Sequence, residues 1–195
     1  MSENRIRFVT FLVVAQIFGA AAINAAPASA QEVPESTLTP GSFKAYAADG
    51  VEARVSNFSG LPVPRYSSLR YDKVNGRAGP SLDYPVAWSY SRVGLPVVIV
   101  RESKEWRKIR DPQGDEVWVH RRMLAAERTV ITTDKGAIRR TAEARSNVVA
   151  HFDAGAVLQL RSCSSAWCEV EAEGRKGFVL KSDVWGADQL PAAEK

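Results

Sequence analysis

From about residue 65 onward, apolar residues fall in short runs that alternate with polar positions, and no run keeps a helical spacing for three turns. The clearest runs are LPVVIV (95–100), EVWVH (116–120), AVLQL (156–160) and KGFVL (176–180). Turn-forming sequences lie between the runs: NG at 75, DPQGD at 111, DKG at 134 and AEG at 172. This pattern predicts an all-β chain of small units, with one short helical turn within residues 181–189.

The apolar pattern occurs twice, with a spacing of about 60 residues. At an offset of 61, the residues Gly94, Val97, Ile99, Trp106 and Ile109 align with Gly155, Leu158, Leu160, Trp167 and Val170. An offset of 60 aligns Trp118 with Phe178, and an offset of 62 aligns Arg77 with Arg139. Single-residue insertions in loops explain the three offsets. We therefore expect two copies of one strand meander, each closing into a small barrel.

The N-terminal part of the chain has a different composition from the rest. Arg5 and Arg7 precede an apolar run that begins at Phe8, and APASAQ follows it with small residues at Ala28 and Ala30. This pattern predicts a signal peptide over residues 1–30, the alternative being an uncleaved N-terminal anchor. Residues 31–64 hold scattered Pro, Gly, Ser and Thr and predict a flexible leader. We expect a periplasmic or secreted protein with no integral membrane segment after signal removal.

Several motifs of the first copy carry a resemblance. VNGRAGPSLDYPVAW (74–88), GLPVVIV (94–100) and EWRKIRDPQGDEVWVHRRML (105–124) resemble a bacterial SH3-like (SH3b) domain, with its N-x-R-x-G-P-S entry, Gly-led strand and terminal G-W-V strand. AERTVI (126–131) and WCEVEAEGRKGFVLKSDVWG (167–186) are similar to the tandem subfamily of exported Gram-negative proteins. The resemblance implies two tandem SH3-like β-barrels, at 65–128 and 129–187, followed by a tail at 188–195.

The chain departs from the family pattern at three places. Glu116 and Val117 replace the usual Gly before Trp118. The second copy has IRRTAEARS (138–146) without the Gly-Pro turn, and Phe178 replaces the terminal-strand Trp. These departures weaken the inference that both copies bind one ligand.

The sequence holds no recognisable catalytic constellation. Its only histidines are His120 and His151, and the phosphate-loop, GxSxG and HExxH motifs are absent from it. No spacing assembles three or four ligands of a zinc site. We therefore expect no enzyme activity, no metal and no cofactor.

The two cysteines, Cys163 and Cys168, leave three interpretations open: a nucleophile paired with His151, part of a metal site, or a disulfide. Export favours the disulfide because thiols outside the cytoplasm are normally oxidised. The repeat also aligns Cys163 with Glu102 and Cys168 with Arg107. An opposite-charge pair and a disulfide can both join neighbouring strands across one turn. Strand parity places Cys163 off the Leu158–Leu160 face, so this turn must twist locally.

Aromatic and basic residues provide the candidate ligand contacts. Trp106 and Trp167 recur in the repeat and are expected in the core, as are Trp118 and Phe178. Trp88 aligns with Ala150 and is specific to the first copy, so the predicted contact residues are Arg77, Tyr84, Trp88 and Tyr90. A predicted basic rim consists of Arg101, Lys104, Arg107, Lys108, Arg110, Arg121 and Arg122. The alternative for this rim is a solvated edge that prevents strand-to-strand association.

The resemblance implies a non-catalytic module that binds a cell-envelope component, either peptidoglycan or an envelope protein. A second hypothesis is an accessory subunit that docks on an envelope enzyme or secretion machine without touching glycan. Nucleic-acid binding suits the sequence pI of 9.2 but not the export signal. The sequence does not fix the oligomeric state.

Overall fold

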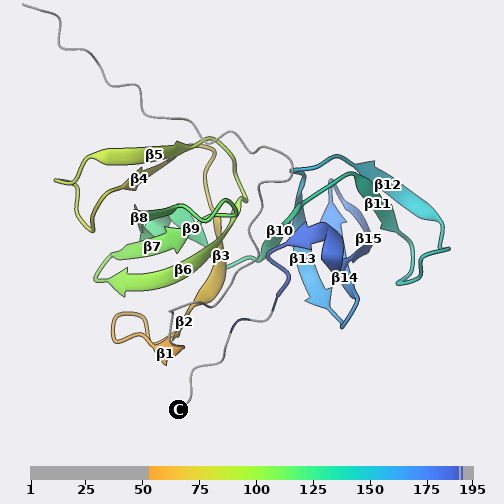
Figure 1. Ribbon diagram of the computed structural model, residues 1–195, viewed down its shortest axis with the longest axis horizontal. Coiled ribbons are helices and arrows are strands. Elements are labelled where there is room, and N and C mark those ends of the chain that lie inside the picture. Colours follow the sequence, from red (N-terminus) through yellow and green to blue (C-terminus); the bar gives the residue numbers. More distant parts are fainter. Residues whose placement is uncertain (1–52, 189, 191–195) are drawn as a thin grey trace, which may run out of the picture. The chain divides into compact units, whose positions relative to one another are not determined.

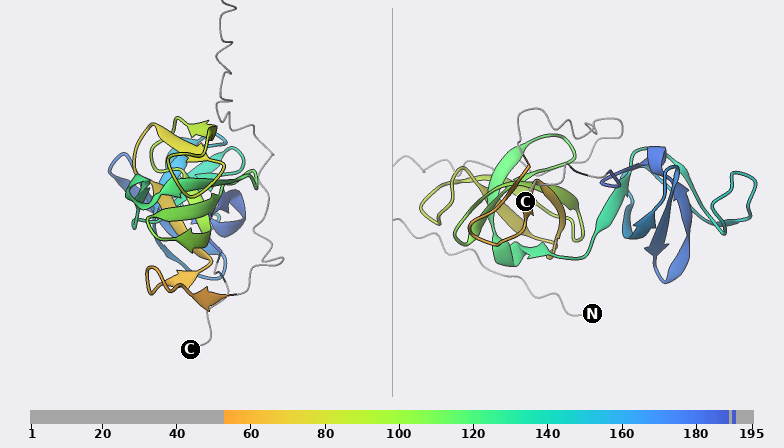
Figure 2. Two further views of the ribbon diagram at one scale, coloured as in Figure 1. Left: turned by 90° about the vertical axis from the view of Figure 1, so that its left-hand side faces the viewer. Right: turned by 90° about the horizontal axis from the view of Figure 1, so that it is seen from below.

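The computed structural model describes residues 53–188 and residue 190 (Figure 1). The predicted signal peptide and residues 31–52 of the predicted leader lie outside these residues, as does most of the predicted tail. The described strands form one two-stranded hairpin and two seven-stranded antiparallel sheets, which Figure 2 shows from two further directions. The all-β prediction is confirmed.

The two large sheets share one strand order. In the first copy the order is β5-β4-β8-β7-β6-β3-β9, and in the second it is β12-β11-β15-β14-β13-β10-β16. The strands of the first copy are β3 (Arg65–Leu69), β4 (Val74–Arg77), β5 (Val86–Tyr90), β6 (Pro96–Ser103), β7 (Trp106–Arg110), β8 (Glu116–His120) and β9 (Leu124–Ala125). Those of the second copy are β10 (Thr129–Thr132), β11 (Gly136–Arg139), β12 (Val148–Phe152), β13 (Val157–Cys163), β14 (Trp167–Ala172), β15 (Arg175–Leu180) and β16 (Val184–Trp185).

The register reproduces the predicted repeat. Arg77 pairs with Trp118 in the first copy, and Arg139 pairs with Phe178 in the second. A short 3-10 helix precedes the last strand of each copy, η1 (Arg121–Met123) and η2 (Lys181–Asp183), so the predicted helical turn is confirmed. Barrel closure is not found, because no ladder joins β5 to β9 or β12 to β16 within the described residues.

The leader prediction is wrong for residues 53–64, which form a small hairpin. β1 (Arg54–Val55) pairs with β2 (Pro62–Val63), and the Val63 side chain is only 1% exposed. The Ser56 hydroxyl donates a hydrogen bond to the buried carboxylate of Glu102. Sequence periodicity did not predict these strands because each has only two residues. The ordered chain therefore starts before residue 65.

Each copy has a core of the alternate residues that face inward along its strands. Val97, Ile109 and Val119 are fully buried in the first copy, and Val170 and Val179 are fully buried in the second. Two residues of the second copy also belong to the core cluster of the first, Ile131 and Trp185. The Trp185 ring meets the Tyr66 ring edge-on, with ring centroids 5.7 Å apart.

Candidate ligand-binding site

Trp106 and Trp167 occupy the same position, the first residue of β7 and of β14. Their neighbours Arg107 and Cys168 are buried, so strand alternation turns both indoles to the outer face, where they are half-buried. The predicted core location of these two tryptophans is therefore wrong. Trp118 is buried as predicted, whereas Phe178 is half-buried.

Trp167 borders a groove of about 520 Å³ in the second copy. The groove lies where the β11–β12 hairpin approaches the start of β14, the end of β15 and η2. It is lined by Lys135, Gly136, Ala137, Arg139, His151, Phe152, Asp153, Trp167, Leu180 and Asp183, and we call it the Trp167 groove. Its lining combines aromatic rings with charges of both signs, which is typical of sites that bind small polar molecules with a flat or apolar part.

Gly136 fixes the position of one aromatic ring in this groove. A Cβ atom at Gly136 would lie 2.4 Å from the Phe152 ring, so only glycine lets the ring lie over this part of β11. Gly136 and Phe152 face each other directly in the antiparallel pair of β11 and β12. The DKG sequence at 134–136 thus provides both a turn and the space for a ring.

We expect Gly136→Ala to displace Phe152 and to cost about 1–3 kcal/mol of unfolding free energy, because the added methyl overlaps the ring. Chemical denaturation would measure the loss. Ala137→Ser is the matched control on the next residue of β11 and should change the free energy by less than about 0.5 kcal/mol. Equal stability of the two variants would contradict the assigned packing.

The first copy has a related groove of about 700 Å³ on its β4–β5 hairpin, lined by Asp72, Lys73, Asn75, Val86, Ser89, Tyr90 and Ser91. At the offset of 62, Lys73 corresponds to Lys135 and Tyr90 to Phe152, so the same part of the fold is hollow in both copies. The lining differs, because Ser89 replaces the aligned His151. The two copies therefore present different chemistry at one location.

Arg77, a predicted contact residue, closes the loop between β4 and β5. Its Nη1 donates to the carbonyl oxygen of Tyr84 at 2.6 Å and to that of Leu82 at 3.1 Å. The aligned Arg139 donates from Nη1 to the carbonyl oxygen of Ser146 at 2.9 Å. Because the contact occurs in both copies, we assign Arg77 a structural role.

We expect Arg77→Ala to loosen residues 78–85 and to cost about 1–2 kcal/mol, since two loop carbonyls lose their donor. Amide hydrogen exchange should rise in that loop. The exposed Arg101→Ala is the control and should leave exchange there unchanged; a similar rise in both variants would argue against the structural role.

The remaining predicted contact residues do not share one surface. Tyr84 is 46% exposed, and a Cβ at Gly79 would lie 2.5 Å from its ring. Trp88 packs against the core of the first copy, and its Nε1 is buried with no hydrogen-bond partner among the described residues. Tyr90 is only 1% exposed and donates to Asp111 at 3.2 Å, so it is a core residue and the prediction is corrected there. Burial and the nearby Asp111 carboxylate raise the pKa of Tyr90.

The predicted basic rim is largely neutralised. Arg107 is buried and paired with Glu102, so it does not belong to a rim. Lys108 and Arg110 both pair with Glu116, at 2.6 and 2.7 Å. Arg121 pairs with Glu105. Three members remain exposed and take part in none of the ion pairs found in the described part of the chain: Arg101, Lys104 and Arg122.

Burial alone would raise the pKa of Glu116, but hydrogen bonds from Lys108 and Arg110 outweigh it and lower the pKa of this carboxyl. Glu116 therefore stays ionised and offsets the two cations. The sequence shows each charge but not which carboxylates approach it, so the sequence alone predicts a more basic rim than the structure has.

The predicted disulfide between Cys163 and Cys168 is confirmed. The two cysteines face each other directly on β13 and β14, and Glu102 and Arg107 face each other at the same register on β6 and β7. A register shift at Leu160/Ser162 supplies the predicted local twist, and a matching shift occurs at Ile99/Arg101. With both thiols joined, neither cysteine is free to act as a nucleophile.

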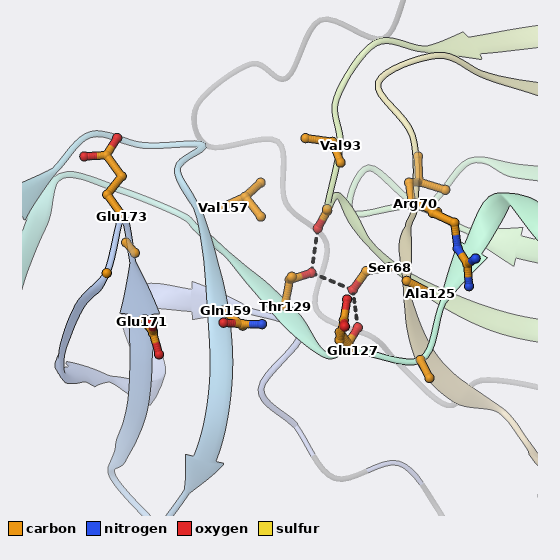
Figure 3. Close-up of a pocket in the computed structure, with 15 residues that line it drawn as sticks. Ser68, Arg70, Val93, Ala125, Glu127, Thr129, Val157, Gln159, Glu171 and Glu173 are labelled. Atoms are coloured by element: carbon orange, nitrogen blue, oxygen red, sulfur yellow. Dashed lines mark hydrogen bonds between the residues drawn. The ribbon is translucent and has the colours of Figure 1, made fainter.

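A larger groove of about 820 Å³ has lining residues from both copies (Figure 3). Its central hydroxyls bond to protein atoms: Ser68 Oγ lies 2.7 Å from Thr129 Oγ1, and Thr129 donates to the Gly94 carbonyl at 2.6 Å. Glu171 at its border pairs with Arg161 at 2.7 Å. Because these polar groups are already paired, we interpret this groove as a junction and not as the ligand site.

A family model described as "Bacterial SH3 domain" matches residues 70–125 and 133–186, which is more than half of the chain. The chain therefore belongs to the bacterial SH3 domain family and carries two such domains in tandem. Within the described residues, no helix is long and apolar enough to cross a membrane.

Among solved structures, the chain is similar to NlpC2 from Trichomonas vaginalis, with 10% identity and a TM-score of 0.30 over 63% of this chain. NlpC1 from the same organism gives 12% identity and a TM-score of 0.30 over 68% of this chain. The match covers 48% of each of those proteins. No curated protein sequence matches the chain.

Proposed function

We propose that this chain is an exported, non-catalytic binding protein of the cell envelope, and that its second SH3 domain binds ligand in the Trp167 groove. The observation that carries the proposal is the half-buried indole beside charges of both signs in one hollow. Aromatic residues of this kind dominate binding energy because they bury a large area at a small entropic cost. Family membership supports a binding role, since SH3 domains are typically binding modules.

The groove chemistry suits a short peptide that carries both amino and carboxylate groups. Lys135 and Asp153 lie 4.0 Å apart with side chains 81 and 88% exposed, so Lys135 can attract a carboxylate, and Asp153 and Asp183 can attract an ammonium group. The indole of Trp167 can cover an apolar or flat part between them. Peptide stems of peptidoglycan combine these groups, and we propose them as the ligand.

The predicted signal peptide and the Cys163–Cys168 disulfide both support a location outside the cytoplasm.

Co-sedimentation of the mature protein with purified peptidoglycan tests the proposal. We expect the wild-type protein to pellet with the wall material and Trp88→Ala to pellet equally once its folding is verified, because Trp88 packs against the core. No retention of the wild-type protein would overturn peptidoglycan binding.

A protein partner in the envelope is the second candidate. The β1–β2 hairpin exposes Val55, Phe58 and Leu61 by 48, 55 and 49%, and apolar side chains gathered on one hairpin can contact another protein. Co-purification from envelope extracts separates the candidates: a partner that is lost with Phe58→Ser but retained with Trp167→Ala would favour docking through the hairpin.

A further inference from the structure

In the first copy, a buried ion pair holds the turn that leads to Trp106. Arg107 Nε lies 2.9 Å from the Glu102 carboxylate. Arg107 Nη1 donates to the carbonyl oxygens of Lys104 at 2.8 Å and Trp106 at 3.0 Å. Glu102 thus fixes Arg107, and Arg107 fixes the backbone on both sides of Glu105. These contacts hold the backbone of the turn from which the outer-face indole of Trp106 projects.

In the second copy, the disulfide occupies the position of that ion pair. The turn between Cys163 and Cys168 leads to Trp167, and Ser164 bonds to the Trp167 backbone in both directions, with Ser164 N donating at 2.8 Å and Trp167 N donating to Ser164 Oγ at 3.2 Å. Lys181 N at the start of η2 donates to the Ala166 carbonyl at 2.9 Å. The same turn therefore connects the indole with η2, which supplies Asp183 to the groove.

We propose that the Cys163–Cys168 disulfide is a positioning element for Trp167, and that its reduction releases the turn and weakens ligand binding in the Trp167 groove. The effect on binding rests on the proposed function. The effect on Trp167 does not, because it follows from the register that the Cys163–Cys168 disulfide shares with the Glu102–Arg107 ion pair. The first copy holds its tryptophan without sulfur and should not respond.

The accessibility of the two sulfurs sets the order of the reaction. Cys163 is exposed, whereas Cys168 is fully buried. One thiolate of a dithiol reductant attacks the Cys163 sulfur, which forms a mixed disulfide and releases Cys168 as a thiol after it takes up a proton. The second thiol of the reductant then attacks the reductant sulfur of the mixed disulfide and releases Cys163 as a thiol. Two electrons pass to the protein, and the dithiol becomes a disulfide.

The experiment compares the indole N–H resonances of the 15N-labelled protein before and after reduction with dithiothreitol. A count of two free thiols per chain verifies complete reduction. We expect the Trp167 resonance to shift or broaden while the Trp106 resonance stays in place, and retention on purified peptidoglycan to fall at least threefold. An unchanged Trp167 resonance in the fully reduced protein overturns the inference, whatever binding does.

A variant without sulfur provides an independent test. Cys163→Ala combined with Cys168→Val keeps an apolar side chain in the buried site and should reproduce the change at Trp167. Dithiothreitol should have no further effect on this variant. A Trp167 resonance at its wild-type position in the folded double variant overturns the inference. A moved resonance with no peptidoglycan retention in either redox state supports the positioning role and overturns the proposed function.

Discussion

Glu102→Gln is expected to destabilise the first copy by about 3–5 kcal/mol, because it leaves the buried Arg107 guanidinium without its counter-charge. The Glu102 side chain is 1% exposed, accepts hydrogen bonds from Ser56 and Arg65, and forms an ion pair with Arg107. A neutral amide cannot balance two cations. Chemical denaturation of the variant and the wild-type protein measures the loss of unfolding free energy.

The exposed pair of Glu105 and Arg121 provides the control. Both side chains are about half exposed, so Glu105→Gln should cost no more than about 1 kcal/mol. A second variant tests whether a disulfide can replace the ion pair, as it does in the second copy. Glu102→Cys combined with Arg107→Cys places two thiols at directly facing positions. We expect this variant to form a disulfide and to be more stable than Glu102→Gln. Equal losses in Glu102→Gln and Glu105→Gln would refute the role of the buried cluster.

The same cluster should make the first copy sensitive to acid. Burial raises the pKa of Glu102, but hydrogen bonds from Ser56, Ser59 and Arg65 outweigh it and hold the pKa below its usual value. A carboxyl with a lowered folded-state pKa stabilises the protein above the pKa of the unfolded chain, and this contribution is lost as the pH falls through the folded-state value. Glu102→Gln should therefore show a flatter decline in stability below the usual glutamate pKa. If Glu102→Gln loses stability at low pH as steeply as the wild-type protein does, other carboxyl groups cause the acid sensitivity.

Trp167→Ala is expected to weaken retention on purified peptidoglycan at least tenfold, which corresponds to about 1.4 kcal/mol or more. Since Trp167 lies half-buried on the outer face of β14, its removal should leave the core intact. Quantitative sedimentation over a range of wall concentrations measures the change, and circular dichroism verifies the fold.

Leu82→Ala is the matched control for this prediction. Leu82 is 73% exposed on the β4–β5 loop of the other copy, so its truncation also removes an accessible apolar side chain. Retention of Leu82→Ala should equal that of the wild-type protein. If Leu82→Ala and Trp167→Ala lose retention to the same extent, binding depends on general surface hydrophobicity and not on the groove.

The repeat and the strand order could be predicted from the sequence because the alternation of apolar residues reports directly which face of a strand is buried. The disulfide follows from the repeat, since aligned positions in the two copies occupy one register. Alternation alone places Cys163 off the Leu158–Leu160 face, and the register shift between Leu160 and Ser162 brings it opposite Cys168. Residues 53–64 could not be predicted, because their two-residue strands are ordered by contacts with distant residues such as Glu102.

The site was only partly predictable. Trp88 is specific to the first copy, which favours a ligand contact there and at its neighbour Tyr90. The alternation of Val86, Trp88 and Tyr90 along β5 already contains the signal that these side chains share the inward face. Recurrence in both copies predicts a core position for Trp167. Strand parity with the neighbouring Cys168 and Val170 contained the signal that it faces outward. The ion-pair partners of the basic residues could not be predicted either, because the pairing of Lys108 and Arg110 with Glu116 depends on the register between β7 and β8.

Chemical-shift mapping with soluble fragments of purified peptidoglycan tests the location of the ligand site most directly. We expect the largest shifts at Trp167, His151 and Lys135, with only small shifts in the first copy. Shifts confined to the β4–β5 loop around Tyr84, or no shifts at saturating fragment concentration, would contradict a ligand site in the Trp167 groove.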